Sequence, residues 1–141
     1  MERRDLAVLG VVVLPIVILF GATPARAHHS FAAEFDSAKP ITLKGTITKL
    51  DFVNPHSWLY INVTEGGKVV NWAIEMGSPN GLIRRGVNKN SVTVGTEVTV
   101  EGYRAKDGSP TANGTTIRLP DGKQLFAGSS APDAPGGERG R

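Results

Sequence analysis

The feature that most constrains the fold is an alternation of apolar and polar residues that is interrupted once. Residues 41–52 alternate with a period of two, which predicts a half-buried strand, and Gly45 in its middle fits a strongly curved strand. The phase shifts at Leu50, which indicates a bulge or bend. Asn54-Pro55 ends the strand, because proline lacks a ladder donor and restricts the residue before it. The alternation resumes over 58–63, so the sequence predicts two strands separated by a polar break.

The remaining elements complete a small all-β pattern. The other predicted strands cover residues 68–76, 97–103, 115–119 and, as a short sixth strand, 124–127. Ser78 followed by Pro79 predicts the start of one short helix, which Gly86 ends. This is the element order of an OB-like Greek-key barrel of five or six strands, with a plain antiparallel sandwich as the alternative. The strand phases place the following side chains in the barrel interior: Leu59, Ile61, Val70, Ile74, Val98, Val100 and Ile117.

Residues 1–27 are predicted to be a secretory signal peptide. Two arginines precede an apolar run over 6–22, and Ala25 and Ala27 give the small-x-small pattern of a cleavage site. Cleavage after Ala27 leaves a mature chain that begins with His28 and is periplasmic or secreted, with no membrane attachment. An uncleaved anchor is the alternative, because the apolar run is at the short edge of a membrane span.

The rest of the chain divides into three parts. Residues 28–40 are predicted to form an N-terminal arm that its two phenylalanines pin to the body, and residues 41–127 to form the barrel. A short helical turn capped by Ser30 is an alternative for the start of the arm. Residues 128–141 contain almost nothing apolar, which predicts a disordered tail.

Composition excludes several classes of protein. The sequence has no cysteine, so an exported domain must fold without disulfides. The formal net charge is +3, and no run of charge is long enough to indicate nucleic-acid binding. There is no G-x-S-x-G elbow and no phosphate-binding glycine loop. Glu75 and Asp51 lie near strand ends, where carboxylates are usually solvated. We therefore expect a binding domain rather than an enzyme.

Three blocks of the sequence resemble a known family. They are residues 28–36, which begin His-His-Ser-Phe, the Asn-Pro-His-Ser block at 54–57, and residues 94–103 with the Lys-Asp-Gly at 106–108. They are similar to a family of small secreted bacterial proteins that is catalogued only as a domain of unknown function. The resemblance implies export and a domain type, and it brings no mechanism.

The histidines form the main candidate site. A mature chain that begins with His28 offers its α-amine and its imidazole Nδ1, which can close one chelate ring on a metal. One further imidazole gives a roughly planar set of three nitrogens, which Cu(II) prefers. His56 is the predicted third ligand, because it follows a strand break at the barrel rim, and His29 is the alternative. Polysaccharide monooxygenases and certain periplasmic copper carriers use an arrangement that this one resembles.

The competing interpretation of the histidines is purely structural. A His-His start is then a flexible chain end, and His56 caps a turn by hydrogen bonding. Zinc is favoured less than copper, because no cysteine or carboxylate is obviously placed to complete a tetrahedral site.

Outward aromatic residues give the alternative binding site. Trp58 and Tyr60 fall on the outward phase of the second strand, and Trp72 on the third is a further candidate, although its phase also fits the core. OB-like barrels bind oligonucleotides or sugars on this face. Here we expect a small ligand, a saccharide or a protein partner, with no nucleic acid and no metal. Trp58 and Tyr60 can instead pack under the N-terminal arm.

Overall fold

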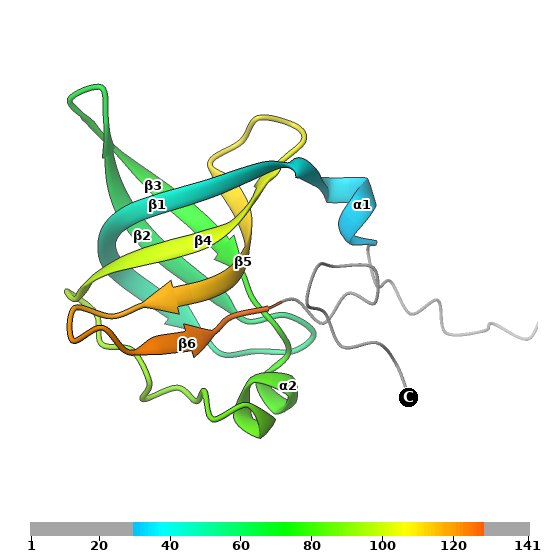
Figure 1. Cartoon of the computed structure of the whole chain (residues 1–141), viewed down its shortest axis with the longest axis vertical. Coiled ribbons are helices and arrows are strands. Elements are labelled where there is room, and N and C mark those ends of the chain that lie inside the picture. Colours follow the sequence, from blue (N-terminus) through cyan, green and yellow to red (C-terminus); the bar gives the residue numbers. More distant parts are fainter. Residues whose placement is uncertain (1–29, 129–141) are drawn as a thin grey trace, which may run out of the picture.

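The computed structural model describes residues 30–128, which form one sheet and two short helices (Figure 1). The helices are α1 (Phe31–Glu34) and α2 (Pro79–Arg84), and the strands are β1 (Phe35–Asp51), β2 (Trp58–Glu65), β3 (Lys68–Glu75), β4 (Glu97–Ala105), β5 (Thr111–Arg118) and β6 (Gln124–Phe126). No helix in this part of the chain is long and apolar enough to cross a membrane. The predicted signal peptide, His28, His29 and residues 129–141 of the predicted tail lie outside the described residues.

Hydrogen bonds close the sheet into a ring. β1 pairs with β2 on one side and with β4 on the other, β2 pairs with β3, and β4 pairs with β5, all antiparallel. A short parallel pairing of residues 73–75 on β3 with residues 111–113 on β5 completes the ring, and β6 extends the sheet beside β5. The predicted all-β fold class is confirmed, and one continuous closed sheet is compatible with an OB-like barrel.

β1 is the strand that both halves of the ring share (Figure 1). Its first part pairs with β4 and its last part with β2. A bulge between Ile47 and Lys49 lies next to the predicted phase shift at Leu50. A Cβ atom on Gly45 would lie 2.5 Å from the carbonyl oxygen of Asn62, so only glycine permits this close approach of β1 to β2.

The structure differs from the predicted boundaries at both ends of the described segment. β1 starts at Phe35 rather than at residue 41, because Phe35 already pairs with Ala105 of β4. A short helix, α1, precedes it, which confirms the alternative of a helical turn capped by Ser30. The Ser30 hydroxyl caps α1 by accepting the Ala33 N–H at 3.2 Å. At the other end Gly128, which the sequence assigns to the tail, is buried.

The ring encloses the hydrophobic core. All but one of the side chains predicted to lie inside are buried, namely Leu59, Ile61, Ile74, Val98, Val100 and Ile117. Val70 is only partly buried, because β3 pairs with β5 only from Ala73 onward and the β2–β3 hairpin extends past the ring (Figure 1). α2 begins at the predicted Ser78 cap and packs Leu82 into the core.

A smaller apolar cluster lies outside the ring, under α1. Phe31 packs against Phe35 of β1 and against Tyr103 and Ala105 of β4. The ring centroids of Phe31 and Tyr103 are 5.6 Å apart in an edge-to-face arrangement, a favourable aromatic geometry. The prediction that the two phenylalanines pin the N-terminal arm to the body is confirmed, and the chain is therefore fixed to the sheet from Phe31 onward.

Candidate functional site

Four side chains form a row across four neighbouring strands on the outside of the ring. Trp58 on β2 is paired with Glu75 on β3, Glu75 with Asn113 on β5, and Asn113 with Tyr103 on β4. Directly paired residues present their side chains on the same face of a sheet. Their chain neighbours on the inner face belong to the core, namely Leu59, Ile74 and Ala112. We call Trp58, Glu75, Asn113 and Tyr103 the outer row.

Glu75 is the buried centre of the outer row. It is 6% exposed, and Asn113 beside it is 1% exposed. Asn113 Nδ2 donates to Glu75 Oε1 at 3.3 Å, and His56 Nδ1 lies 3.6 Å from the same oxygen. A buried carboxylate needs such polar neighbours, because burial without them is strongly unfavourable. The expectation that Glu75 is solvated is therefore wrong.

The connection between β1 and β2 places His56 beside Glu75. The Ser57 N–H donates to the Gly77 carbonyl at 3.0 Å, and the Met76 N–H donates to the Ser57 carbonyl at 2.8 Å. The β2–β3 ladder thus continues by one residue beyond the start of β2. His56 is the next residue, and its side chain is only 12% exposed. The strand break predicted from the sequence therefore brings the histidine to the outer row.

A cavity of about 380 Å³ lies between Trp58, α1 and the β4–β5 connection. Its polar lining comes from Glu34, Lys106, Asp107, Ser109 and Thr111. Lys106 Nζ donates to the Ala32 carbonyl at 2.6 Å, which ties α1 to the end of β4. Hydrogen bonds from the side chain and backbone N–H of Ser109 lower the pKa of Asp107, so this carboxylate is charged at neutral pH. One aromatic wall with a few polar groups is a lining that suits a small polar ligand.

The three aromatic residues predicted to bind a ligand do not form one platform. Trp58 lines the cavity, whereas Tyr60, further along the same face of β2, lies under Lys49, whose Nζ is 5.3 Å from the ring centroid. Trp72 is 1% exposed, and its Nε1 donates to Glu65 Oε1 at 2.8 Å. Trp72 therefore lies in the core, as its strand phase predicts, and not on an outward binding surface.

Asp51, the other carboxylate near a strand end, is partly exposed. Its Oδ2 lies 2.7 Å from Lys49 Nζ, and this hydrogen bond raises the pKa of Lys49. Asp51 and Trp58 are paired across β1 and β2, so Asp51 lies next to the outer row. Its ion pair with an exposed lysine is a surface contact and defines no site by itself.

Of the predicted metal ligands, His56 lies within the described residues and His28 and His29 lie outside them. Over residues 30–128, no three His, Asp or Glu side chains are grouped closely enough to hold a metal ion. His56 and Glu75 supply two such groups at the outer row.

Sequence reasoning misses Asn113 and the burial of Glu75. It predicts no strand between residues 103 and 115, whereas β5 already begins at Thr111. The available signal is an Asn-Gly pair that continues without interruption into a β-forming run. The parallel pairing that brings Asn113 to Glu75 joins residues 38 positions apart, and no local pattern predicts it.

The fold and the outer row define a small all-β domain with one buried polar cluster on the outside of its closed sheet. The model of a family of unknown function, DUF6152, matches residues 16–115. The chain belongs to this family, and the predicted resemblance to a family of unknown function is confirmed. No curated protein and no solved structure matches the chain.

Proposed function

We propose that the chain is an exported copper-binding domain of the periplasm or the extracellular space. In this proposal His28 holds Cu(II) through its α-amine and its Nδ1, and His56 supplies the third nitrogen, with His29 as the alternative ligand. The observation that supports it is that His56 and the N-terminal end of the described chain both contact the outer row. His56 contacts Glu75 in this row, and Phe31, three residues after His28, contacts Tyr103 in the same row.

Strand spacing and chain length are compatible with this site. Glu75 and Tyr103 are separated by two strand spacings across β5, roughly 10 Å. Three residues of extended chain span at most about 10 Å. His28 lies three residues before Phe31, so the proposed site requires an extended chain that runs along the outer row toward Glu75.

The available donors suit copper. An amine and two imidazoles make a nitrogen-rich set, and Cu(II) leads the divalent first-row metals in affinity for such sites. An amino terminus ordinarily titrates near 7.7–8.0, so a metal can displace its proton at neutral pH. Over residues 30–128 no three metal-binding side chains are grouped, so the proposed site depends on the N-terminus for its remaining donors.

Calorimetric titration of Cu(II) into the mature protein, residues 28–141, tests the proposal. We expect one ion per chain and an electron paramagnetic resonance spectrum with nitrogen ligands. His56→Ala removes one ligand and should weaken binding by at least about tenfold, in line with the sensitivity of metal sites to single changes. Equal affinities of His56→Ala and the wild type would contradict the proposed ligand set.

The cavity beside Trp58 supports a second candidate function, which is binding of a small ligand, a saccharide or a protein partner without metal. Trp58 forms its aromatic wall, and acidic, basic and hydroxyl groups line the rest. Because Trp72 is buried in the core, a change in tryptophan fluorescence on adding a saccharide would report on Trp58. The change should be absent in Trp58→Phe. No response to a panel of saccharides would count against the saccharide form of this candidate.

A further inference from the structure

Packing alone does not explain the buried pair of Glu75 and Asn113. Asn113 Nδ2 donates to Glu75 Oε1, yet the Oδ1 of Asn113 is buried without a hydrogen-bond partner among the described residues. An unpaired buried carbonyl is unfavourable, and an apolar residue at this strand position would avoid it. The side chain of Asn113 does hydrogen-bond to the Glu75 carboxylate, and this hydrogen bond holds the carboxylate in place.

The held carboxylate faces His56. The Nδ1 of His56 lies 3.6 Å from Glu75 Oε1, and the two side chains are only 12% and 8% exposed. In metal sites, a ligating histidine usually directs its second ring nitrogen toward a carboxylate, which fixes the tautomer and the orientation of the ring. At 3.6 Å the two atoms are at ion-pair distance rather than hydrogen-bonded, and the negative charge of the carboxylate favours the proton of a neutral imidazole on the nitrogen that faces it.

We infer that Glu75, held by Asn113, is a positioning residue that keeps the proton of His56 on Nδ1 and makes Nε2 the nitrogen that binds the metal. The metal part of this inference rests on the proposed copper site. The tautomer part belongs equally to the metal-free protein, because the contact between Glu75 and His56 involves no metal.

Nitrogen-15 NMR of the metal-free mature protein tests the tautomer. Long-range spectra at about pH 8, where a free imidazole is neutral, distinguish protonated from unprotonated ring nitrogens. The signals of His56 are assigned by their loss in His56→Gln. We expect the Nδ1–H form to predominate in the wild type. Glu75→Leu removes the acceptor at similar volume, and the Nε2–H form should then gain.

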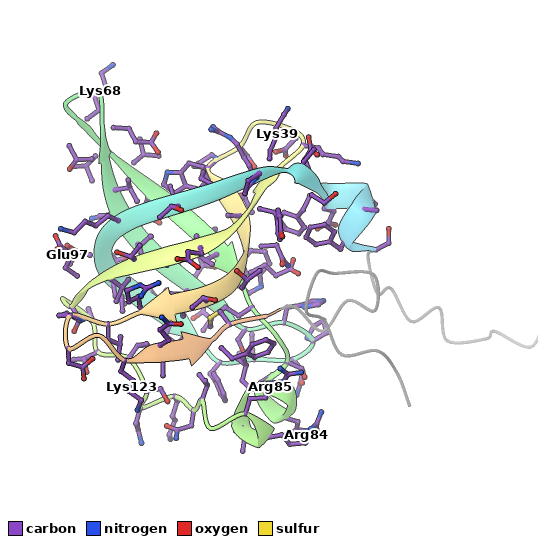
Figure 2. The ribbon with its side chains drawn as sticks, in the orientation of Figure 1. Lys39, Lys68, Arg84, Arg85, Glu97 and Lys123 are labelled. Carbon is purple, nitrogen blue, oxygen red and sulfur yellow. The ribbon has the colours of Figure 1, made fainter. Side chains whose placement is uncertain are left out.

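Glu97→Leu is the matched control. Glu97 lies at the end of β4 opposite to the end that packs on α1, projects outward in Figure 2, and pairs with Lys44 at 2.8 Å. Its removal should leave the tautomer of His56 unchanged. Predominance of the Nε2–H form in the wild type would overturn the inference, as would equal tautomer populations in the wild type and Glu75→Leu.

A second variant covers the case in which Glu75→Leu does not fold. Glu75→Gln keeps a carbonyl that can accept the Nδ1–H but removes the charge, so we expect a tautomer population between those of the wild type and Glu75→Leu. The wild-type spectrum decides the tautomer on its own if neither variant folds.

Copper affinity separates this inference from the proposed function. We expect Glu75→Leu to bind Cu(II) about 10- to 100-fold more weakly than the wild type, and Glu97→Leu to bind it equally well. Unchanged affinity in Glu75→Leu would contradict the positioning role and leave the proposed copper site standing. A wild-type protein that binds no Cu(II) would contradict the proposed site, and the tautomer measurement would then decide the inference by itself.

Discussion

Glu75 and Asn113 face each other across the parallel pairing that closes the sheet, and a 3.3 Å hydrogen bond joins their side chains. The contact that completes the ring of strands therefore also fixes the carboxylate next to His56. Closure of the fold and assembly of the candidate site depend on the same three residue pairs between β3 and β5.

Replacing Asn113 with aspartate should destabilise the domain in a pH-dependent way. Asn113→Asp puts a second carboxylate against Glu75 in a buried place, which should cost on the order of 3 kcal/mol at neutral pH. Repulsion raises the pKa of the introduced aspartate above its ordinary value near 3.9. The loss of folding stability is therefore present above that pH and shrinks as the pH falls toward it. Urea unfolding at a series of pH values measures this. A deficit that does not change with pH would show that like-charge repulsion is not its cause.

The core assignment makes a separate prediction. Ile61 is fully buried in the ring, so Ile61→Ala should reduce the free energy of unfolding by about 2–5 kcal/mol. Val69 on the protruding hairpin is 67% exposed, and Val69→Ala should change the free energy of unfolding by no more than about 0.5 kcal/mol. Equal losses in the two variants would contradict the strand phase described here.

Copper at the outer row should quench tryptophan fluorescence through Trp58. Trp58 is paired with Glu75, which contacts His56, whereas Trp72 is enclosed in the core. We expect saturating Cu(II) to quench most of the emission of the wild type and much less of the emission of Trp58→Phe. Fluorescence titration measures both. Similar fractional quenching in the wild type and Trp58→Phe would contradict a Cu(II) site beside Trp58 on the outer row.

Local patterns predict most of this fold and part of the site. The alternation over residues 58–63, the bulge near Leu50 and the helix after Ser78 follow from rules that act over a few residues, and all are present. The same rules place His56 at a strand break. They misplace the start of β1, because Phe35 is held in the sheet by its pairing with Ala105, a residue of the neighbouring strand β4 that is 70 positions away in the sequence.

The part of the site that the sequence does not predict depends on distant pairing. A carboxylate at the end of β3 is expected to be solvated, and Glu75 is buried because β5 pairs beside it and His56 lies next to it. Trp72 is a different case. The alternation of β3 alone fits the core position in which it lies, and only its size and type suggest a binding surface.

The most direct test of the copper proposal compares the mature protein with a form whose α-amine at His28 is acetylated. Acetylation converts the α-amine of His28 into an amide and removes the chelate ring without adding a new amine, while α1 and the sheet remain as they are. We predict that the acetylated form folds with the same melting temperature and loses most of its Cu(II) affinity in a competition titration. Equal affinity in the two forms would contradict the account, because the amino terminus of His28 would then have no part in the site.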